Sequence, residues 1–398
     1  MELIQVTDKA GSKAFHQVAR DMYREDKNWI CTPDPLIESI FTPGENSFFD
    51  HGEAIRWVLK DGKGKSIGRV AAFINEKKAW SYDQPTGGMG FFECIHDREA
   101  AFMLFDACRK WLEERKMEAM DGPINFGEND NFWGLLVEGY HRPSFGMQYH
   151  HPYYKDLFEA YGFQLYYEQV TNILNLRKPF PERFWKIAEW IRNKPGYHWE
   201  HFRLDQKDKY IRDLKTIYDA AWAFHENFTP IKEEDLHRTV KTSRHLIVEE
   251  FIWFVYHEGE PIAFLVMFPD ANQLFARLSG KMHFLDTLRF LYYKNKGIFT
   301  RGRITIMGVV PKYQKYGVES GIFWELDKVM KRNPQYIDIE LSWVGDFNPK
   351  MRSLHESVGA DFYMRHYTYR KLFREDAGFK RSTIIPVNTK EQTLGKEG

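Results

Sequence analysis

One segment of the sequence combines a glycine turn with the start of a helix, an arrangement that suits a phosphate group. Residues 309–319 have the sequence Val-Val-Pro-Lys-Tyr-Gln-Lys-Tyr-Gly-Val-Glu, between a predicted strand and a predicted helix. The glycine, Gly317, lets the backbone approach a ligand closely. The first amides of a helix have no partners within it, and they favour an anion. The segment therefore predicts a pyrophosphate site.

A second segment, residues 348–359, predicts a short helix with a proline near its first turn and a glycine just past its end. Residues 151–162 align with it without gaps at an offset of 197, and Pro, Leu, Glu and Gly coincide. Each copy precedes an aromatic strand, at residues 163–167 and 362–369. The two segments therefore point to an internal repeat.

The elements around these segments repeat in the same order. Each half has a predicted hairpin with Gly at the reversal, formed by residues 55–59 with 67–74 and by 251–256 with 262–268. Strand, helix and strand follow in each half, which implies parallel pairing with a right-handed crossover. The predicted ranges are 90–95, 99–115 and 117–120 in the first half, and 303–310, 317–331 and 336–344 in the second. The matching order predicts a duplicated domain.

These patterns predict an α/β (α+β) fold of two tandem domains, each a mixed twisted sheet flanked by helices. Pro179 and Pro181 interrupt the pattern between the halves. We therefore place the domains at residues 1–178 and 179–373, followed by a polar tail, 374–398. The stretch 121–150 has no counterpart in the second half. It is rich in Gly, Asn and aromatic residues, and we expect a long structured loop.

Composition excludes several classes of protein. Lysine plus arginine equals aspartate plus glutamate at 56 each, and a nucleic-acid binder usually has a basic excess. Three scattered cysteines form neither a disulfide framework nor a zinc pattern, and the spacing of His141, His150 and His151 suggests no metal site. The N-terminus lacks an apolar core, and the most apolar stretch, 251–268, contains a turn. We expect a cytoplasmic protein with no membrane span, as a monomer or homodimer.

The first segment resembles the GCN5-related N-acetyltransferase superfamily, whose strand-to-helix signature is Gln/Arg-x-x-Gly-x-Gly/Ala. Gln314 and Gly317 supply the first two fixed positions, and Glu319 departs from the third. A carboxylate there could compete with phosphates for the same amides, or it could point to solvent.

The second segment resembles the family pattern Asn-x-x-Ala-x-x-Leu-Tyr-Glu-x-x-Gly-Phe. Asn348, Leu354, Glu356 and Gly359 match, whereas His355 replaces the family's tyrosine, with further departures at Met351 and Ala360. The likeness covers residues 247–373. The first half resembles the family in its hairpin and helix pattern alone, and residues 122–126 and 134–139 look like those of bacterial tandem acetyltransferase-like proteins.

The resemblance implies transfer of an acetyl or other acyl group from acyl-coenzyme A to a primary amine of a small molecule or peptide. By resemblance, His355 takes the place of the tyrosine that protonates the departing thiolate, and its repeat partner is Phe158, which cannot donate a proton. A histidine there could donate as an imidazolium that titrates near neutrality. The alternative is a buried neutral histidine that bonds a neighbouring carbonyl. Glu340, on the face of its strand that carries Asp338, is the candidate base, and the alternatives are that both carboxylates are solvated or ion-paired, or that water relays the proton to a base. The predicted coenzyme A contacts are Val309, Val310, Gln314, Lys315, Tyr316, Gly317, Val318 and Asn348.

Two further groups of residues have competing explanations. Lys294, Lys296, Arg301 and Arg303 could meet coenzyme A phosphates, or they could belong to a solvated loop. The run Trp222, His225, Asn227 and Pro230 could border the acceptor, and Trp222 could equally be packed in the core.

The first half lacks a glycine at its strand-to-helix turn, residues 95–98, and we expect it to be a degenerate copy that supports the fold and could wall the substrate cleft. The alternative is that it has an unrelated ligand site of its own. Two rival functions remain open: a catalytically inactive ligand-binding protein of the same fold, and an aminoacyl-tRNA-dependent transferase of a related duplicated fold. The latter usually needs a basic surface and a helical arm, and neither is evident in the sequence.

Overall fold

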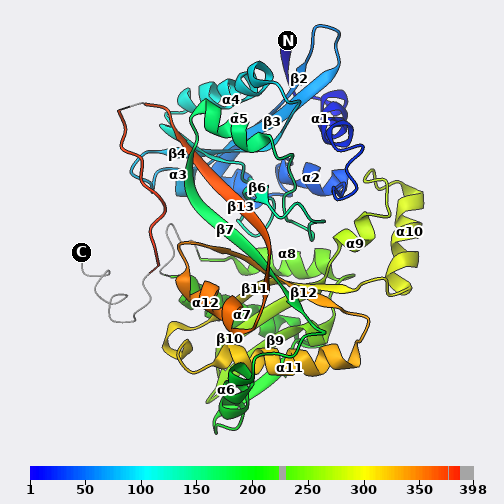
Figure 1. Ribbon diagram of the computed structural model, residues 1–398, viewed down its shortest axis with the longest axis vertical. Helices are drawn as coiled ribbons and strands as arrows, with labels where there is room; N and C mark the ends of the chain where they lie inside the picture. Colours follow the sequence, from blue (N-terminus) through cyan, green and yellow to red (C-terminus); the bar gives the residue numbers. More distant parts are fainter. Residues whose placement is uncertain (224–229, 375, 386–398) are drawn as a thin grey trace. The chain divides into compact units, whose positions relative to one another are not determined.

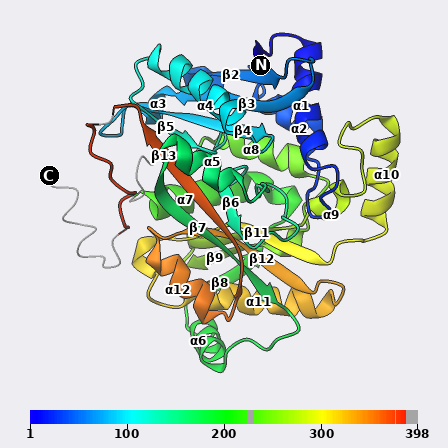
Figure 2. The ribbon, with the colours of Figure 1, turned by 45° about the horizontal axis from the view of Figure 1, so that its top comes forward.

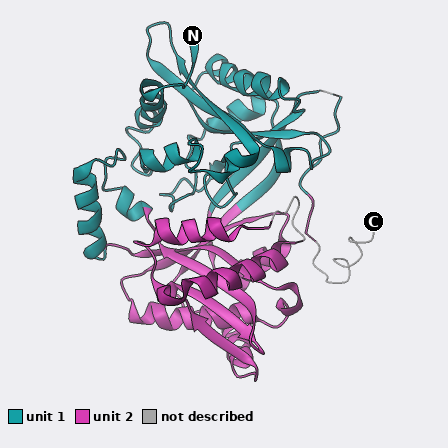
Figure 3. Ribbon diagram, turned by 180° about the vertical axis from the view of Figure 1, so that it is seen from behind, with its two compact units in different colours: residues 1–169, 272–297, 364–382 teal, residues 170–271, 298–363, 383–398 magenta. Residues whose placement is uncertain are grey.

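The computed structural model describes residues 1–223, 230–374 and 376–385, which form two compact units (Figure 3). Unit 1 comprises Met1–Gln169, Asn272–Gly297 and Met364–Ser382. Unit 2 comprises Val170–Ala271, Ile298–Tyr363 and the described residues from Thr383 on. Each unit therefore takes segments from both halves of the sequence. The division of the sequence into domains 1–178 and 179–373 with a tail 374–398 stays a prediction.

Unit 1 contains a mixed sheet with helices on both faces. Its sheet has the strand order β1-β2-β3-β4-β5-β13, in which β4 and β5 are parallel and the other pairs are antiparallel, and β6 also pairs with β13. The elements are β1 (Glu2–Gln5), α1 (Lys9–Met22), α2 (Asp34–Ile40), η1 (Ser47–His51), β2 (Gly52–Lys60), β3 (Ser66–Asn75), α3 (Glu76–Ala79), β4 (Thr86–Cys94), α4 (Arg98–Glu113), β5 (Ala119–Gly122), β6 (Leu135–Glu138), α5 (Tyr154–Tyr161), α9 (Asn272–Phe275) and α10 (Phe284–Asn295).

Side-chain alternation along β3 explains how helices cover both faces of this sheet. Val70 and Ala72 pack with Leu104 and other residues of α4, which lies over β3 and β4 (Figure 2). Ala71, between them, packs on the opposite face with Phe15 of α1. Because successive side chains of a strand point to opposite faces, a strand that is buried on both faces is mostly apolar, and the buried Arg69 is the charged exception in β3.

Unit 2 has the same kind of sheet, with the strand order β8-β9-β10-β11-β12-β7 and parallel pairing of β11 with β12. β7 (Gln164–Asn175) and β13 (Asp361–Leu372) each begin in the segments of one unit and end in those of the other. The remaining elements are α6 (Glu182–Arg192), β8 (Tyr197–His201), η2 (Leu204–Gln206), α7 (Lys207–Trp222), α8 (Glu233–Ser243), η3 (Glu249–Phe251), β9 (Ile252–His257), β10 (Glu260–Pro269), β11 (Arg301–Val309), η4 (Pro311–Tyr313), α11 (Val318–Arg332), β12 (Asp338–Gly345) and α12 (Pro349–Ser357).

The core of unit 2 lies between its sheet and α7. Tyr210 and Ile217 of α7 pack with Phe254 and Phe264 of the central hairpin. Helix α11 packs against β9 and β10, and α6 lies along α11 (Figure 1). The strand-to-helix turn at 309–318 therefore has the sheet on one side and α6 on the other.

The predicted repeat is present in the order of the elements. Residues 154–161 form α5 and residues 349–357 form α12, and each helix is followed by a left-handed glycine, Gly162 or Gly359. Both predicted hairpins and both strand-helix-strand units are found, with parallel pairing of β4 with β5 and of β11 with β12. The predicted α/β fold of two tandem domains is therefore confirmed.

One feature of the fold had no signal in the sequence: the last strands are exchanged. β13, which ends the second half, pairs with β5 through Tyr369–Gly122 and Leu372–Ala119. β7, which ends the first half, neighbours β12 in the sheet order, and the Leu176 N–H beyond it donates to the Ile337 carbonyl at 3.0 Å. The exchange explains why each unit contains segments of both halves.

Candidate functional site

The parallel strands β11 and β12 stop pairing before they end. Their register runs from Arg301–Asp338 to Ile304–Leu341, after which β11 continues to Val309 and β12 to Gly345. Residues 305–307 and 342–343 beyond the last pair are only half-buried. Strands that separate in this way leave backbone groups between them without ladder partners. The two strand ends therefore lead toward the turn that precedes α11.

Gly317 begins α11 in the left-handed conformation, with φ +71° and no side-chain cap. A Cβ at this position would clash with Ile187 of α6, so the turn requires glycine for both its backbone angle and its space. No N-cap side chain bonds the first amides, so those that the Glu319 carboxyl does not engage are left for another partner. The turn therefore has the backbone form that the sequence-based prediction requires, and the pyrophosphate site itself stays a prediction.

The turn before Gly317 is held by one of its own side chains and by a backbone bond to β10. The Gln314 amide donates to the Val309 carbonyl at 3.0 Å, and the Val310 N–H donates to the Ile262 carbonyl at 2.9 Å. Among the other predicted contacts, Lys315 and Tyr316 are exposed, whereas Val318 is buried. The predicted set therefore divides into residues that shape the turn and residues that face solvent.

A lysine that the sequence reasoning missed lies beside this turn. Lys350, the second residue of α12, donates to the Gln314 side-chain oxygen at 3.1 Å. Its pKa is lowered by burial and by the nearby positive charge of Lys315. Two ammonium groups that repel each other at the start of a helix favour an anion between them. The contact joins residues 36 positions apart, and no local pattern in the sequence signals it.

Glu319, the departure from the family signature, is half-buried in the first turn of α11. Burial raises the pKa of its carboxyl group to about 7, against a smaller lowering by its own backbone amide. Near neutral pH the group is therefore partly protonated, and it opposes a bound phosphate less than a fully ionised carboxylate would.

Asn348 and His355 both lie on α12, and both are engaged within unit 2. The Asn348 side chain caps the helix, accepting from the Met351 N–H at 3.2 Å. His355 is buried, and its Nδ1 lies 3.1 Å from the Asn172 amide nitrogen, which donates to it. Burial lowers the pKa of His355 to about 4, so the ring is neutral at pH 7 and carries its proton on Nε2. The predicted titration of this histidine near neutrality is therefore not what its environment favours.

Glu340 is fully buried and pairs with Arg303, which lies opposite it in the strand register at 3.5 Å. Among the residues that the structure describes, neither of its carboxylate oxygens has a hydrogen-bond partner. Asp338 pairs with Arg301 through two contacts of 2.6 and 3.2 Å. This placement favours the alternative of ion-paired carboxylates, and a role for Glu340 as base stays a prediction.

The other two groups from the sequence do not form single clusters. Arg301 and Arg303 are engaged in these ion pairs in unit 2, whereas Lys294 and Lys296 belong to unit 1. Trp222 stacks on Tyr218 and Phe264, as core packing predicts. His225 and Asn227 lie outside the described residues.

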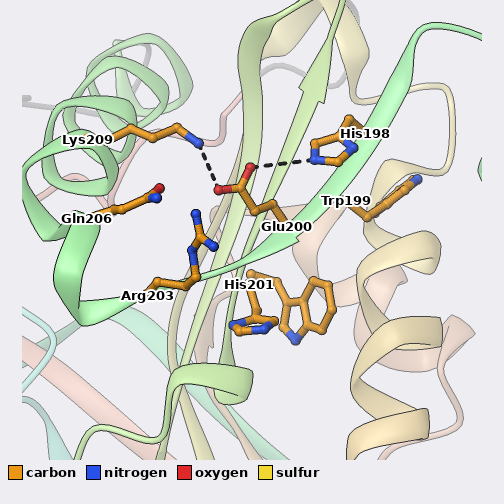
Figure 4. Close-up of a pocket in the computed structure, with 8 residues that line it drawn as sticks. His198, Trp199, Glu200, His201, Arg203, Gln206 and Lys209 are labelled. Atoms are coloured by element: carbon orange, nitrogen blue, oxygen red, sulfur yellow. Dashed lines mark hydrogen bonds and ion pairs between the residues drawn. The ribbon is translucent and has the colours of Figure 1, made fainter.

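A surface recess of about 470 Å³ lies elsewhere in unit 2, on the edge strand β8 and the start of α7 (Figure 4). Its charged groups neutralise one another: Glu200 accepts from Lys209 at 2.8 Å and lies 3.5 Å from His198. These contacts lower the pKa of Glu200 although burial alone would raise it. None of the predicted site residues lines this recess.

Two searches of the described residues gave negative results. They contain no group of three or more His, Cys, Asp or Glu side chains placed to hold a metal ion. In the same part of the chain, no helix combines the length and the apolar character needed to span a bilayer.

Comparison with known proteins adds two kinds of likeness, although no family model matches the chain. It is 28% identical to "Bacterial ceramide synthase" from Caulobacter vibrioides (strain NA1000 / CB15N) over 382 residues, 93% of this chain and 97% of that protein. It is 27% identical to "Protein YghO" from Escherichia coli (strain K12) over 378 residues, 92% of this chain and 93% of that protein.

Two solved structures share its architecture. A tandem GNAT protein from the clavulanic acid biosynthesis pathway superposes with a TM-score of 0.56 at 12% identity, covering 94% of this chain and 99% of that one. A GCN5-related N-acetyltransferase from Sphaerobacter thermophilus gives 0.54 at 13% identity, covering 96% and 98%. The chain therefore has the fold of tandem GNAT proteins, as the segments at 309–319 and 348–359 predicted.

Proposed function

We propose that the protein is an N-acyltransferase that uses acyl-coenzyme A and acts on the primary amine of a sphingoid-type long-chain base, forming a ceramide-like amide. One observation carries this proposal: the chain aligns over nearly its whole length with a protein named bacterial ceramide synthase. The tandem GNAT fold supports the reaction class, because a protein of this architecture, the one from Sphaerobacter thermophilus, is described as an N-acetyltransferase.

In the proposed reaction, the amine nitrogen attacks the thioester carbonyl carbon, the C–N bond forms and the C–S bond breaks. The proton lost by the amine balances the charge of the departing thiolate. The protein must therefore hold the thioester in place, provide a path for the proton and stabilise the sulfur. Little of this requires a reactive side chain, which is consistent with the ion-paired carboxylates of β12.

We assign the coenzyme A pyrophosphate to the amides around Lys315–Val318, with Val309 and Val310 along the pantetheine and Lys350 as an added cation. The open helix start at Gly317 and the mutual repulsion of Lys315 and Lys350 support this assignment. The pantetheine arm, placed between the ends of β11 and β12, would hydrogen-bond the backbone groups that those strands leave unpaired.

We assign His355 to the departing sulfur. As a neutral ring with its proton on Nε2, it hydrogen-bonds a thiolate and lowers the energy of the transition state, and it needs no imidazolium. Asn172 orients the ring through Nδ1. Glu340 stays our candidate base, and its pairing with Arg303 favours a route in which water relays the proton.

Turnover with defined substrates tests the proposal. The purified protein is incubated with acetyl- or palmitoyl-coenzyme A and with sphinganine or a short alkylamine, and thiol release is followed together with the mass of the product. We expect one thiol released per amide formed, with the long-chain base preferred over the short amine. Thiol release without an amide, or no release with any pair, would contradict the proposal.

A second candidate is a protein of this fold that binds acyl-coenzyme A without turnover. Two features favour it: a carboxyl group, Glu319, stands at the helix start, and the candidate base Glu340 is buried in an ion pair with Arg303. Calorimetry separates the two: binding of coenzyme A with no thiol release from any acyl-coenzyme A supports the second candidate.

A further inference from the structure

Helix α10 of unit 1 exposes a continuous apolar surface. The exposed fractions of its large apolar residues are 75% for Phe284, 64% for Leu285, 48% for Leu288, 44% for Leu291 and 59% for Tyr292. Other exposed apolar residues of unit 1, such as Trp80 and Leu36, lie on separate elements. Scattered apolar residues are ordinary on a surface, whereas a continuous group marks a site of interaction.

The five side chains form one stripe along the helix. At 3.6 residues per turn they cover an arc of about 120°, the width of a normal apolar helix face. Basic residues border this arc, with Arg289 and Lys296 on one side and Lys294 on the other. We call these five apolar residues the α10 stripe.

The opposite face of α10 attaches the helix to unit 1. Asp286 is buried there, and its carboxylate accepts from the Ser279 hydroxyl and from the Ser279 N–H at 3.3 Å. Just before the helix, the Gly280 carbonyl accepts from the Asp34 N–H at 2.8 Å. Asp286 therefore faces the protein, whereas the apolar side chains of α10 are exposed. Figures 1 and 3 show the course of this helix within unit 1.

We propose that the α10 stripe docks on an anionic lipid bilayer. A helix with an apolar face of Phe and Leu and with Lys and Arg at its borders lies in the interface of a membrane, where the apolar face enters the acyl chains and the cations meet lipid phosphates. Tyrosine, as at Tyr292, is enriched at that depth. The stretch 281–297 has four basic residues and one acidic residue, the buried Asp286, although the whole chain has no net charge.

The border charges favour a bilayer over a second copy of the chain. In a two-fold dimer through the stripe, Lys294 and Lys296 would lie against a helix with the same basic borders, whose one acidic residue, Asp286, is buried and pairs with Arg289 at 3.7 Å. Like charges across an interface oppose association. An anionic surface satisfies all of them at once. The inference does not depend on the proposed enzymatic reaction.

Flotation of the full-length protein with vesicles tests the proposal. We expect binding to phosphatidylglycerol–phosphatidylethanolamine vesicles, weaker binding to phosphatidylcholine vesicles, and release by salt. The double variant Phe284→Ser with Leu288→Ser should lose at least about tenfold in partitioning, since each buried side chain contributes on that scale. Its matched control is Leu36→Ser with Trp80→Ser, which removes exposed apolar side chains from the same unit.

Charge reversal forms the second arm. Lys294→Glu with Lys296→Glu should lower binding to anionic vesicles by about 25-fold or more, since each cation near the surface contributes about fivefold. The same reversal at Lys63 and Lys65, exposed in the β2–β3 turn of unit 1, should change it little. Thermal unfolding confirms that all variants are folded.

Two outcomes would overturn the proposal. One is equal binding of the wild type and the stripe variants to anionic vesicles, or no binding by any of them. The other is a dimer in sedimentation that the stripe variants dissociate without any vesicle binding by the wild type, which would assign the stripe to a second copy. Because the assay contains neither acyl-coenzyme A nor amine, its result is separate from that of the turnover experiment.

Discussion

The two halves of the chain differ in how the helix after the strand-to-helix turn is capped. In the first half, the Asp97 carboxylate caps α4 and accepts from the Ala100 N–H at 2.8 Å. In the second half, Gly317 begins α11 and offers no side chain. A helix start whose amides are taken by its own carboxylate repels a phosphate, whereas an open one attracts it.

The parallel strands before these helices differ in the same sense. After the last β4–β5 pair, Gly88–Asp121, the Ile124 N–H donates to the Met89 carbonyl at 2.8 Å, and the chain at Ile124 leaves no room for a Cβ at Gly90. All of β4 is buried, whereas β11 is half-buried at 305–307. The comparison teaches that a duplicated framework can be retained in both halves while protein groups occupy the ligand position in the first half and leave it open in the second.

Transfer of a first-half residue to the second half should have the largest effect. His355→Phe places at α12 the residue that α5 carries as Phe158, which is wholly buried. We expect turnover to fall by roughly 10²–10⁴-fold, as for loss of a positioned proton-bearing group, with coenzyme A binding unchanged. Near-normal turnover would assign His355 to packing. The wild-type rate should show no limb at pH 6–7 from this residue, because its pKa is about 4.

The next largest effect is expected when the first half's N-cap residue, an aspartate, is placed at the start of α11. Gly317→Asp should weaken coenzyme A binding at least about hundredfold, because it adds a charge, a Cβ and strain at a positive φ. Gly317→Asn has the same size, and Asn and Asp are both among the non-glycine residues that adopt a positive φ, so the difference between the two variants in calorimetry chiefly measures the charge. Equal losses would mean that the clash with Ile187, and not the anion site, determines the result.

Lys350 should contribute on a smaller scale. Lys350→Met keeps most of the aliphatic chain and removes the charge, and we expect affinity for coenzyme A to fall about tenfold, as for one charge-assisted hydrogen bond. Lys331→Met, at the far end of α11, is the matched control and should bind normally. If the two variants bind alike, the pyrophosphate does not lie at this turn.

Glu319 should make binding depend on pH by a few fold. With a carboxyl pKa of about 7, the wild type gains a negative charge at the helix start as the pH rises from 6 to 8, and its affinity should fall relative to Glu319→Gln. Between the unfolded-chain pKa of 4.5 and pH 7, the folded protein keeps a proton that the unfolded chain loses. The free energy of unfolding should therefore fall over that window in the wild type by about 2 kcal/mol more than in the variant. Parallel pH profiles would contradict the assignment.

The smallest effect is expected in the first half, where the position that corresponds to the coenzyme A site is already occupied by protein groups. Asp97→Ala should cost about 1 kcal/mol of stability through the lost cap. It should not create a second coenzyme A site, because Ile124 still blocks β4. Calorimetry that gave two sites per chain in this variant would show that the cap alone closes the first half.

Local patterns were sufficient for most of the framework. Both hairpins, the two strand-helix-strand units and the helices that end at Gly162 and Gly359 follow from alternation, turn residues and capping, which act over a few neighbours. The strand exchange, the pairing of Glu340 with Arg303 and the contact of Lys350 with Gln314 join distant residues. No short-range signal distinguishes a carboxylate that will be buried with a partner from one that will face a ligand.

The α10 stripe illustrates the same limit. Its sequence has the ordinary pattern of an amphipathic helix, which predicts an apolar face turned toward a core. The buried Asp286 and the segment at 279–280 hold the opposite face instead. The sequence by itself therefore determined the elements, their order and the glycine at the helix start, because these depend on local backbone energetics. Tertiary packing decided which half is open, which ionisable groups are neutralised and which face of α10 meets solvent, because each depends on which distant side chain occupies the space.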